Sequence, residues 1–123
     1  MDVSAIKKVF LGMVAFLLFS CGGEEKKPDD ILPESKMISV MIDLRIAEGK
    51  VAVLTLNNDS SRVLFKELEK RVFSEHEIDS ASYVQSYQYY MLRPEEALYI
   101  ADAVIDSLKV IQQIQETGKR PDR

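Results

Sequence analysis

The single cysteine of the chain, Cys21, directly follows an apolar stretch near the N-terminus. A secretory signal needs a positively charged start, an apolar run of about 7–15 residues and small residues before the cleavage point. Here Lys7 and Lys8 supply the charge, and the apolar run covers residues 9–19 with one glycine inside it. A transmembrane helix needs about 20 apolar residues. The stretch therefore predicts a cleaved signal sequence, residues 1–20, and not a membrane span.

The three residues before Cys21 match the motif at which bacterial lipoprotein signals are cleaved: Leu18, Phe19 and Ser20. In that motif the cysteine thiol receives a diacylglyceryl group before cleavage. A lone cysteine in an exported protein cannot form an internal disulfide, so lipidation would also explain its presence. Phe19 is bulkier than the small residue usual at its position, and an ordinary signal with a free thiol is the alternative. Two or three acyl chains on Cys21 would make a stable membrane anchor.

Glu48 and His76 are the other two residues whose chemistry stands out. Helical spacing places Glu48 within an apolar stripe, where a carboxylate must be neutral, paired or hydrogen-bonded. We expect a structural pair with Arg45, with a cation of the next helix or with a tyrosine hydroxyl. A binding or catalytic carboxylate is one alternative, and an exposed Glu48 that the helical spacing misplaces is the other.

His76, the only histidine, stands among acidic residues. Neither a nucleophile motif nor a group of metal ligands accompanies it. We expect it to complete the hydrogen bonds of a helix end, in preference to catalysis or metal binding. The sequence therefore predicts no catalytic residue, no metal, and no cofactor apart from the covalent lipid on Cys21.

All five tyrosines lie between residues 83 and 99. Tyrosine supplies rigid amphipathic area and is common at interfaces. At the spacing 83–87–90, however, three of the rings are explained more simply as the core side of one helix. Tyr89 is expected to point away from that side. It is therefore, with Glu48 and His76, a candidate residue for binding a partner.

Composition favours a small all-α domain and argues against one class of partner. The chain has 123 residues, a formal net charge of −4 and no tryptophan. An acidic chain gives no support to nucleic-acid binding, which requires a basic surface. Removal of residues 1–20 leaves enough chain for one domain. We predict an all-α fold, a small bundle of about four helices, and no nucleic-acid partner.

Capping and turn signals divide the remaining chain. Residues 21–32 contain the lipidated cysteine and a charged, flexible tether that is not expected to bury a core. The helical domain is predicted over residues 33–115, and residues 116–123 are predicted to be a disordered tail. Helix starts are predicted near four points: Pro33, the cluster 57–60, Asp79 or Ser80, and Pro94. Pro94 also ends the preceding helix.

Apolar residues recur at helical spacing in each predicted helix. The first helix has a broad apolar face, wide enough to touch two partner helices. The second directs one set of side chains inward: Leu64, Phe65, Leu68, Val72 and Phe73. It directs a charged set outward: Lys66, Glu67, Glu69 and Lys70. The third places five residues on one face: Tyr83, Val84, Tyr87, Tyr90 and Met91. The fourth has one apolar stripe: Leu98, Ala101, Val104, Ile105, Leu108 and Ile111.

The order of several short motifs resembles a known family. The motifs are Ile-Leu-Pro-x-x-Lys-Met at 31–37, Asp-Leu-Arg-Ile-Ala-Glu at 43–48, the segment 72–80, and Tyr-Tyr at 89–90 shortly before a proline. Together they resemble the small Bacteroidota lipoproteins grouped as domain of unknown function 4296, over about residues 30–111. Arg45 stands where a histidine is expected. The resemblance implies an all-helical envelope lipoprotein and no established activity.

These features lead to one functional hypothesis and two alternatives. We expect a lipid-anchored binding or accessory module that works within an envelope protein complex. One alternative is a purely structural lipoprotein. The other is a small enzyme that uses Glu48 and His76 in a cleft between the first two helices. The expected location is the outer membrane. The periplasmic face is favoured over the cell surface, because two lysines at 26–27 follow the acidic pair 24–25 that would favour surface export.

Overall fold

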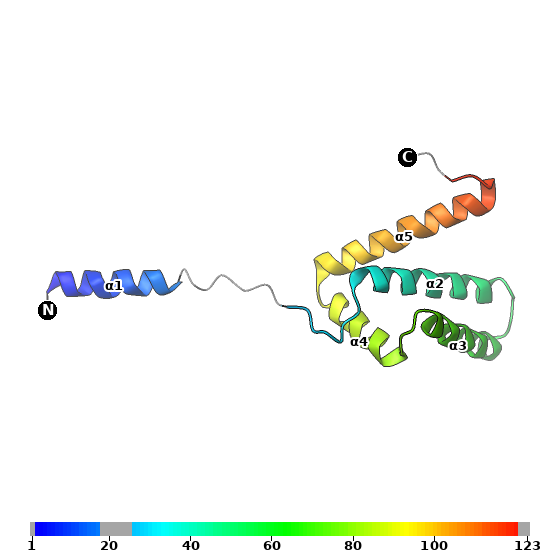
Figure 1. Ribbon diagram of the computed structural model, residues 1–123, viewed down its shortest axis with the longest axis horizontal. Coiled ribbons are helices and arrows are strands. Elements are labelled where there is room, and N and C mark those ends of the chain that lie inside the picture. Colours follow the sequence, from blue (N-terminus) through cyan, green and yellow to red (C-terminus); the bar gives the residue numbers. More distant parts are fainter. Residues whose placement is uncertain (1, 18–25, 121–123) are drawn as a thin grey trace.

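The computed structural model describes residues 2–17 and 26–120, and for residues 13–17 it describes the backbone alone. This part of the chain is all-helical (Figure 1), which confirms the predicted fold class. Its helices are α1 Val3–Leu17, α2 Glu34–Ala52, α3 Asn58–Glu75, α4 Ser80–Met91 and α5 Pro94–Thr117. The count is therefore five and not about four. The additional helix, α1, lies inside the predicted signal sequence, and α2–α5 correspond to the four predicted helices.

Local capping explains where the helices begin. The Asn57 side chain accepts a hydrogen bond from the backbone N–H of Ser60 at the start of α3. Asp79 caps α4 in the same way through Ser82, and Pro94 occupies the first turn of α5. Each cap satisfies backbone N–H groups that have no partner inside the helix. The predicted helix starts are therefore confirmed.

Helix α2 is the centre of the domain. It lies between α3 and α5 and also contacts α4 (Figure 1). Five of its residues are buried: Met37, Val40, Leu44, Ala47 and Val51. They recur every three or four residues, so one broad face meets several neighbours. The prediction that this helix touches two partner helices is confirmed.

The core consists of two clusters that meet on α2. One joins residues from α2, α4, α5 and the segment before α2: Ile31, Met37, Tyr90, Ile100 and Val104. The other joins α2 to α3: Val40, Leu44, Val72 and Phe73. The first cluster holds α4 and α5 in place, and the second fixes α3.

The prediction that residues 21–32 form a tether without core contacts is wrong for its last residues. Ile31 is buried in the first cluster. The backbone N–H of Leu32 donates to Ser86 Oγ at 2.8 Å, and Tyr90 Oη donates to the Leu32 carbonyl at 2.6 Å. These bonds satisfy backbone groups that would otherwise lose water on burial. The domain therefore begins before Pro33, because two apolar residues follow the charged part of the segment.

The predicted faces of α4 and α5 need correction. On α4 the buried residues are Ser86 and Tyr90, whereas three residues of the predicted apolar face are exposed: Val84, Tyr87 and Met91. Ser86 is buried because its hydroxyl bonds both the 31–32 segment and the Ser82 carbonyl. On α5 the buried residues are Ile100 and Val104. Two residues of its predicted stripe, Leu98 and Ile105, are exposed. Only a narrow face of α5 meets α2 and α4.

Helix α5 continues to Thr117, two residues beyond the predicted end of the domain. Gly118 follows with φ +66°, the left-handed conformation that commonly ends a helix, and its N–H bonds the Ile114 carbonyl. Glycine suits this position because it has no Cβ to clash. No helix in the described part of the chain is long and apolar enough to cross a membrane.

The cap of α4 is expected to make stability depend on pH. Hydrogen bonds from Ser82 hold the pKa of the Asp79 carboxyl below its ordinary 3.8. Because this pKa is lower in the folded state, the carboxylate stabilises the fold above pH 3.8, and that stabilisation is lost as pH falls through the folded-state pKa.

We predict that wild type loses melting temperature more steeply below pH 3.8 than Asp79→Asn does. Asparagine keeps the capping oxygen but does not titrate. The measurement is a series of melting curves for both proteins from neutral pH into this acid range. Parallel profiles would show that the charge of the cap contributes nothing.

Candidate functional site

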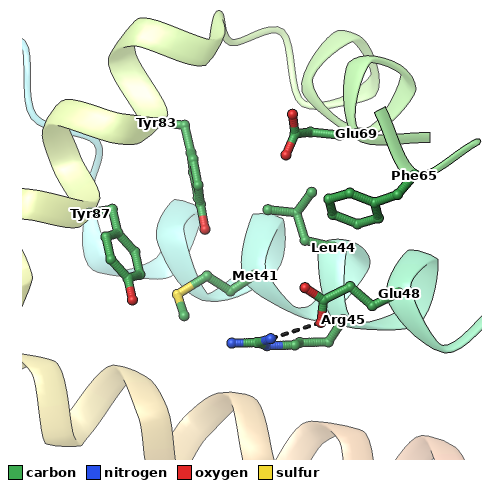
Figure 2. A pocket seen from close by; sticks show the side chains of 8 residues that line it. All are labelled: Met41, Leu44, Arg45, Glu48, Phe65, Glu69, Tyr83 and Tyr87. Atoms are coloured by element: carbon green, nitrogen blue, oxygen red, sulfur yellow. Dashed lines mark hydrogen bonds and ion pairs between the residues drawn. The ribbon is translucent and has the colours of Figure 1, made fainter. Parts of the chain in front are cut away.

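A pocket of about 250 Å³ opens where α2, α3 and α4 meet (Figure 2). Helix α2 contributes the side chains on one flank of its buried face, α3 contributes one edge, and α4 contributes two tyrosines. The lining residues are Met41, Leu44, Arg45, Glu48, Phe65, Glu69, Tyr83 and Tyr87. The pocket therefore combines an apolar base with aromatic walls and a charged rim.

The apolar and aromatic parts are positioned by helical spacing. Met41 and Leu44 are one turn apart on α2, and Phe65 faces them from α3. Tyr83 and Tyr87 are one turn apart on α4, with ring centroids 6.2 Å apart. In Figure 2 both rings extend from α4 toward α2. Tyr83 also packs against Phe73 at 5.2 Å between centroids, so the second core cluster holds this ring in place.

Glu48 forms the expected pair with Arg45, but it is not buried. Arg45 Nη1 lies 2.7 Å from Glu48 Oε2, and the two side chains are 54% and 47% exposed. The hydrogen bond to Glu48 raises the pKa of the Arg45 guanidinium. The pairing is confirmed, whereas the predicted burial is wrong, since each of the two side chains keeps about half of its surface exposed. The pair stands at the rim of the pocket.

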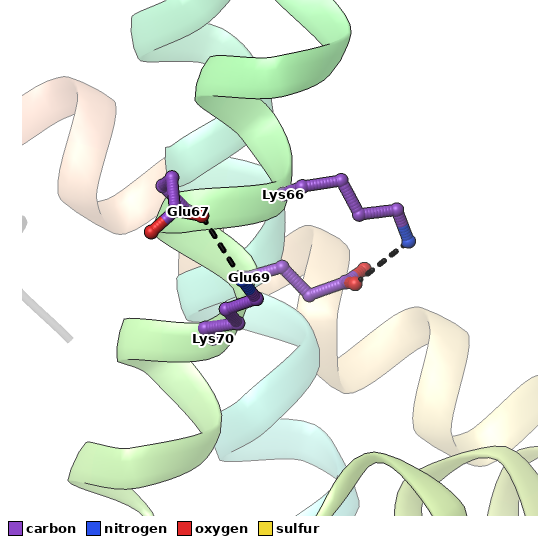
Figure 3. A network of polar contacts seen from close by, with 4 residues as sticks. All are labelled: Lys66, Glu67, Glu69 and Lys70. Atoms are coloured by element: carbon purple, nitrogen blue, oxygen red, sulfur yellow. Dashed lines mark hydrogen bonds and ion pairs between the residues drawn. The ribbon is translucent and has the colours of Figure 1, made fainter.

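Glu69 is the rim residue that sequence reasoning missed. It was expected to point outward with its neighbours on α3, yet it lines the pocket and its side chain is 23% exposed. Glu67, two residues earlier, is 64% exposed and pairs with Lys70 on another side of the helix (Figure 3). The signal was the spacing from Phe65: a residue four positions further lies on the same face of a helix.

The tyrosine hydroxyls complete the polar part of the pocket. Burial raises the pKa of Tyr83 above its ordinary 10.0, and the hydroxyl of Tyr87, Glu69 and Glu48 raise it further, while Arg45 lowers it. Tyr83 thus remains protonated at neutral pH and can donate a hydrogen bond. Within the part of the chain that the structure describes, neither tyrosine hydroxyl has a hydrogen-bond partner.

His76 lies at the end of α3 and does not line the pocket. Its Nε2 is 2.7 Å from Asp43 Oδ2 on α2, and its side chain is 16% exposed. His76 therefore makes a hydrogen bond at a helix end, but not the expected one: the bond joins the end of α3 to α2 and does not complete the hydrogen bonds of the loop. The structure does not bring His76 and Glu48 into one cleft.

The sequence predicts that Tyr89 points away from the face that carries Tyr83, Tyr87 and Tyr90 and is available to a partner, but in the structure it is partly buried in the packing of the domain. Its ring packs at a right angle to that of the buried Tyr90, with the centroids 5.3 Å apart, and the Arg93 guanidinium lies over the Tyr89 ring at 3.6 Å from its centroid. Tyr89 is consequently part of the packing around the first core cluster. The more exposed tyrosines are Tyr99, at 57%, and Tyr87, at 40%.

The predicted lipidation motif lies outside the described residues, since Leu18, Phe19, Ser20 and Cys21 all fall between residues 17 and 26. A search of the described residues finds no group of three or more histidine, cysteine, aspartate or glutamate side chains placed to hold a metal ion. What the described site offers chemically is aromatic surface, hydroxyl groups and carboxylates around an apolar base.

The fold and the pocket together define a small all-helical domain built around one central helix. The family model described as Domain of unknown function (DUF4296) matches residues 28–114, and the chain belongs to this family. The match begins before α2, in agreement with the packing of Ile31 and Leu32 into the domain. No curated protein and no solved structure matches the chain significantly.

Proposed function

We propose that the protein is a cell-envelope lipoprotein, anchored by a covalent lipid on Cys21, whose helical domain binds a partner in an envelope protein complex. The observation that carries this proposal is the order of charge, apolar run and cysteine in residues 7–21. We place it at the outer membrane, with the periplasmic face preferred. The lipid and not a charged surface provides the membrane contact, because the chain is acidic.

The N-terminal helix supports the proposal. Helix α1 is 15 residues long, shorter than a membrane span requires. Among the side chains that the structure describes in this helix, five apolar ones are exposed: Val3, Ile6, Val9, Phe10 and Leu11. None of these five side chains belongs to either core cluster of the described residues. An exposed apolar run suits a segment that is recognised in the membrane during export and then removed.

The segment before α2 packs onto the domain, and this limits the distance between the domain and the lipid on Cys21. Lys27 Nζ donates to Tyr90 Oη at 2.9 Å, and the hydrogen bond with Tyr90 raises the pKa of Lys27. Only residues 22–26 separate this contact from Cys21. At about 3.4 Å per residue, the domain would stay within about 20 Å of the lipid. A partner would therefore be bound close to the membrane.

The pocket supports a binding module over an enzyme. Its polar groups are a paired arginine, two glutamates and two tyrosines, without a nucleophile next to a base as covalent catalysis needs. Amphipathic aromatic surface with a charged rim is typical of sites that recognise part of another molecule.

Cell fractionation of wild type and Cys21→Ser tests the anchor. Wild type is expected in the membrane fraction, resistant to extraction by high salt and released by detergent. Cys21→Ser is expected to lose stable membrane attachment, because no acyl chain can be added. A matched control, Ser20→Ala, keeps both the cysteine and a small residue at the cleavage point and should fractionate like wild type. Equal membrane attachment of wild type and Cys21→Ser would contradict lipid anchoring.

A further inference from the structure

The pocket between α2, α3 and α4 has the size and the charge of a site for a single long cationic side chain. Drug-sized ligands occupy sites of about 300–1,000 Å³, and this pocket, at about 250 Å³, is smaller. Its base is apolar and its rim is polar (Figure 2). One flexible side chain with an aliphatic stem and a polar end fits this arrangement better than a larger cofactor or metabolite does.

The charges that line the pocket favour a cation. Arg45 is neutralised by Glu48 at 2.7 Å, which leaves Glu69 as the additional lining charge. An anion would have to separate Arg45 from Glu48 and approach two carboxylates. A cation meets the Glu69 carboxylate and the electron-rich faces of Phe65, Tyr83 and Tyr87, which attract positive charge. The unpartnered tyrosine hydroxyls add oxygen acceptors.

The present partner of Glu69 does not block this role. Lys66 Nζ lies 3.0 Å from Glu69 Oε1, but the lysine side chain is 62% exposed and does not line the pocket. An exposed pair three residues apart on a helix contributes little to stability, and either side chain can exchange partners at small cost. The Glu69 side chain itself is mostly covered, so its carboxylate is held at the rim where an incoming cation would meet it (Figure 2).

We propose that this pocket binds a lysine or arginine side chain presented by a protein partner, with its stem on Met41, Leu44 and Phe65 and its charge at Glu69. This inference rests on the proposed binding function and names the chemistry of the partner. Tyr83 and Tyr87 line the path of the side chain, and their hydroxyl oxygens accept hydrogen bonds from its charged end. The partner segment is therefore basic, in keeping with the acidic character of this chain.

The test is a titration of the protein as it is purified from cells, from whichever fraction contains it and in a non-ionic detergent, with short glycine peptides that differ in one central residue. That residue is arginine, lysine, norleucine or glutamate, and binding is followed by calorimetry and by the NMR signals of the tyrosine rings. Arginine and lysine peptides are expected to bind and to shift those signals. Equal binding of the norleucine or glutamate peptide, or no binding by any peptide, would overturn the proposal.

Two variants of α3 form a matched pair for this titration. Glu69→Gln is expected to weaken binding of the cationic peptides about tenfold, the loss of one charged hydrogen bond. Glu67→Gln makes the same charge change on another side of the helix (Figure 3) and should bind like wild type. An equal loss in both variants would show a general effect of net charge and would contradict the site. If Glu69→Gln does not fold, Tyr83→Phe, which keeps the ring and removes the hydroxyl, must weaken binding instead.

Free arginine and putrescine carry the same kinds of cation without a peptide backbone. They are expected to bind more weakly than the peptides, and binding at least as tight would assign the pocket to a small cation and overturn the protein partner. This test does not depend on lipidation. If the peptides do not bind, the pocket proposal fails, but the fractionation of wild type and Cys21→Ser still supports the anchor. If the anchor proposal is wrong, only the fractionation result changes.

Discussion

Replacing Tyr90 with alanine is expected to lower the free energy of unfolding by about 3–5 kcal/mol, the range for a buried aromatic residue. Tyr90 is 0% exposed and belongs to the first core cluster. Its hydroxyl also holds the segment before α2, by donating to the Leu32 carbonyl and accepting from Lys27. One substitution thus opens a cavity and releases the start of the domain. Since small domains are stable by only about 5–15 kcal/mol, the variant should be close to unfolding.

Denaturant unfolding curves, followed by circular dichroism, measure this effect and separate its two parts. Tyr90→Phe keeps the ring and removes the hydroxyl, so it should cost about 1–3 kcal/mol, the penalty for leaving the Leu32 carbonyl without its partner. Tyr99→Ala is the control, since Tyr99 is 57% exposed and surface changes usually stay within about 0.5 kcal/mol. If Tyr90→Ala and Tyr99→Ala unfold at the same denaturant concentration, the first core cluster is assigned incorrectly.

Leu44→Ala is expected to have the second largest effect, about 2–5 kcal/mol. Leu44 is 7% exposed and lies between α2 and α3 in the second core cluster. Its removal leaves a void beside Val72 and Phe73, which rigid helices can only partly close. Leu108→Ala on α5 should cost less, because Leu108 packs beside the first cluster and is only half-buried.

The control for Leu44→Ala is Leu98→Ala. Apolar spacing alone assigns Leu98 to the core, but this residue is 63% exposed. Thermal melting of the variants ranks the three positions. The structure predicts the order Leu44, Leu108 and then Leu98, with the last close to wild type. A melting temperature of Leu98→Ala as low as that of Leu44→Ala would support the sequence-derived stripe of α5 over the observed one.

The helix boundaries followed from the sequence because their causes are local. An asparagine or aspartate accepts a hydrogen bond from an N–H three residues later, as Asn57 and Asp79 do. A proline restricts the residue before it and suits a first helical turn, as Pro94 does. Such signals act within one turn of the chain, so a single sequence contains them. The broad face of α2 was also predictable, because a face that meets several neighbours tolerates small errors in orientation.

The narrow buried faces of α4 and α5 could not be predicted from the sequence, because which residues are buried depends on which helix packs against them. Ser86 is buried only because the backbone of Leu32 supplies a partner for its hydroxyl, and this contact spans 54 positions in the sequence. The two neighbours of Tyr89 named above, Tyr90 and Arg93, are close to it in sequence. Its place was still not predictable, because Tyr89 also packs against the first core cluster, which several helices build together. Hydrophobic periodicity indicates which apolar residues share a helix face, and it cannot predict that a serine is buried.

The pocket was only partly predictable. The Arg45–Glu48 pair is local and was expected, whereas Glu69 and Tyr87 meet it only after three helices pack together. The role of His76 was predicted in kind but not in partner, since Asp43 lies on another helix. Residues that join different elements need the fold before they can be placed.

The most direct test of the proposed lipoprotein function is the intact mass of the membrane-extracted protein, compared between wild type and Cys21→Ser. Wild type is expected to lack its first 20 residues and to carry the added mass of acyl chains. That added mass should be absent from Cys21→Ser, because serine offers no thiol for the lipid. A wild-type protein that is cleaved but not acylated, or that retains its full length, would contradict the lipid anchor on Cys21.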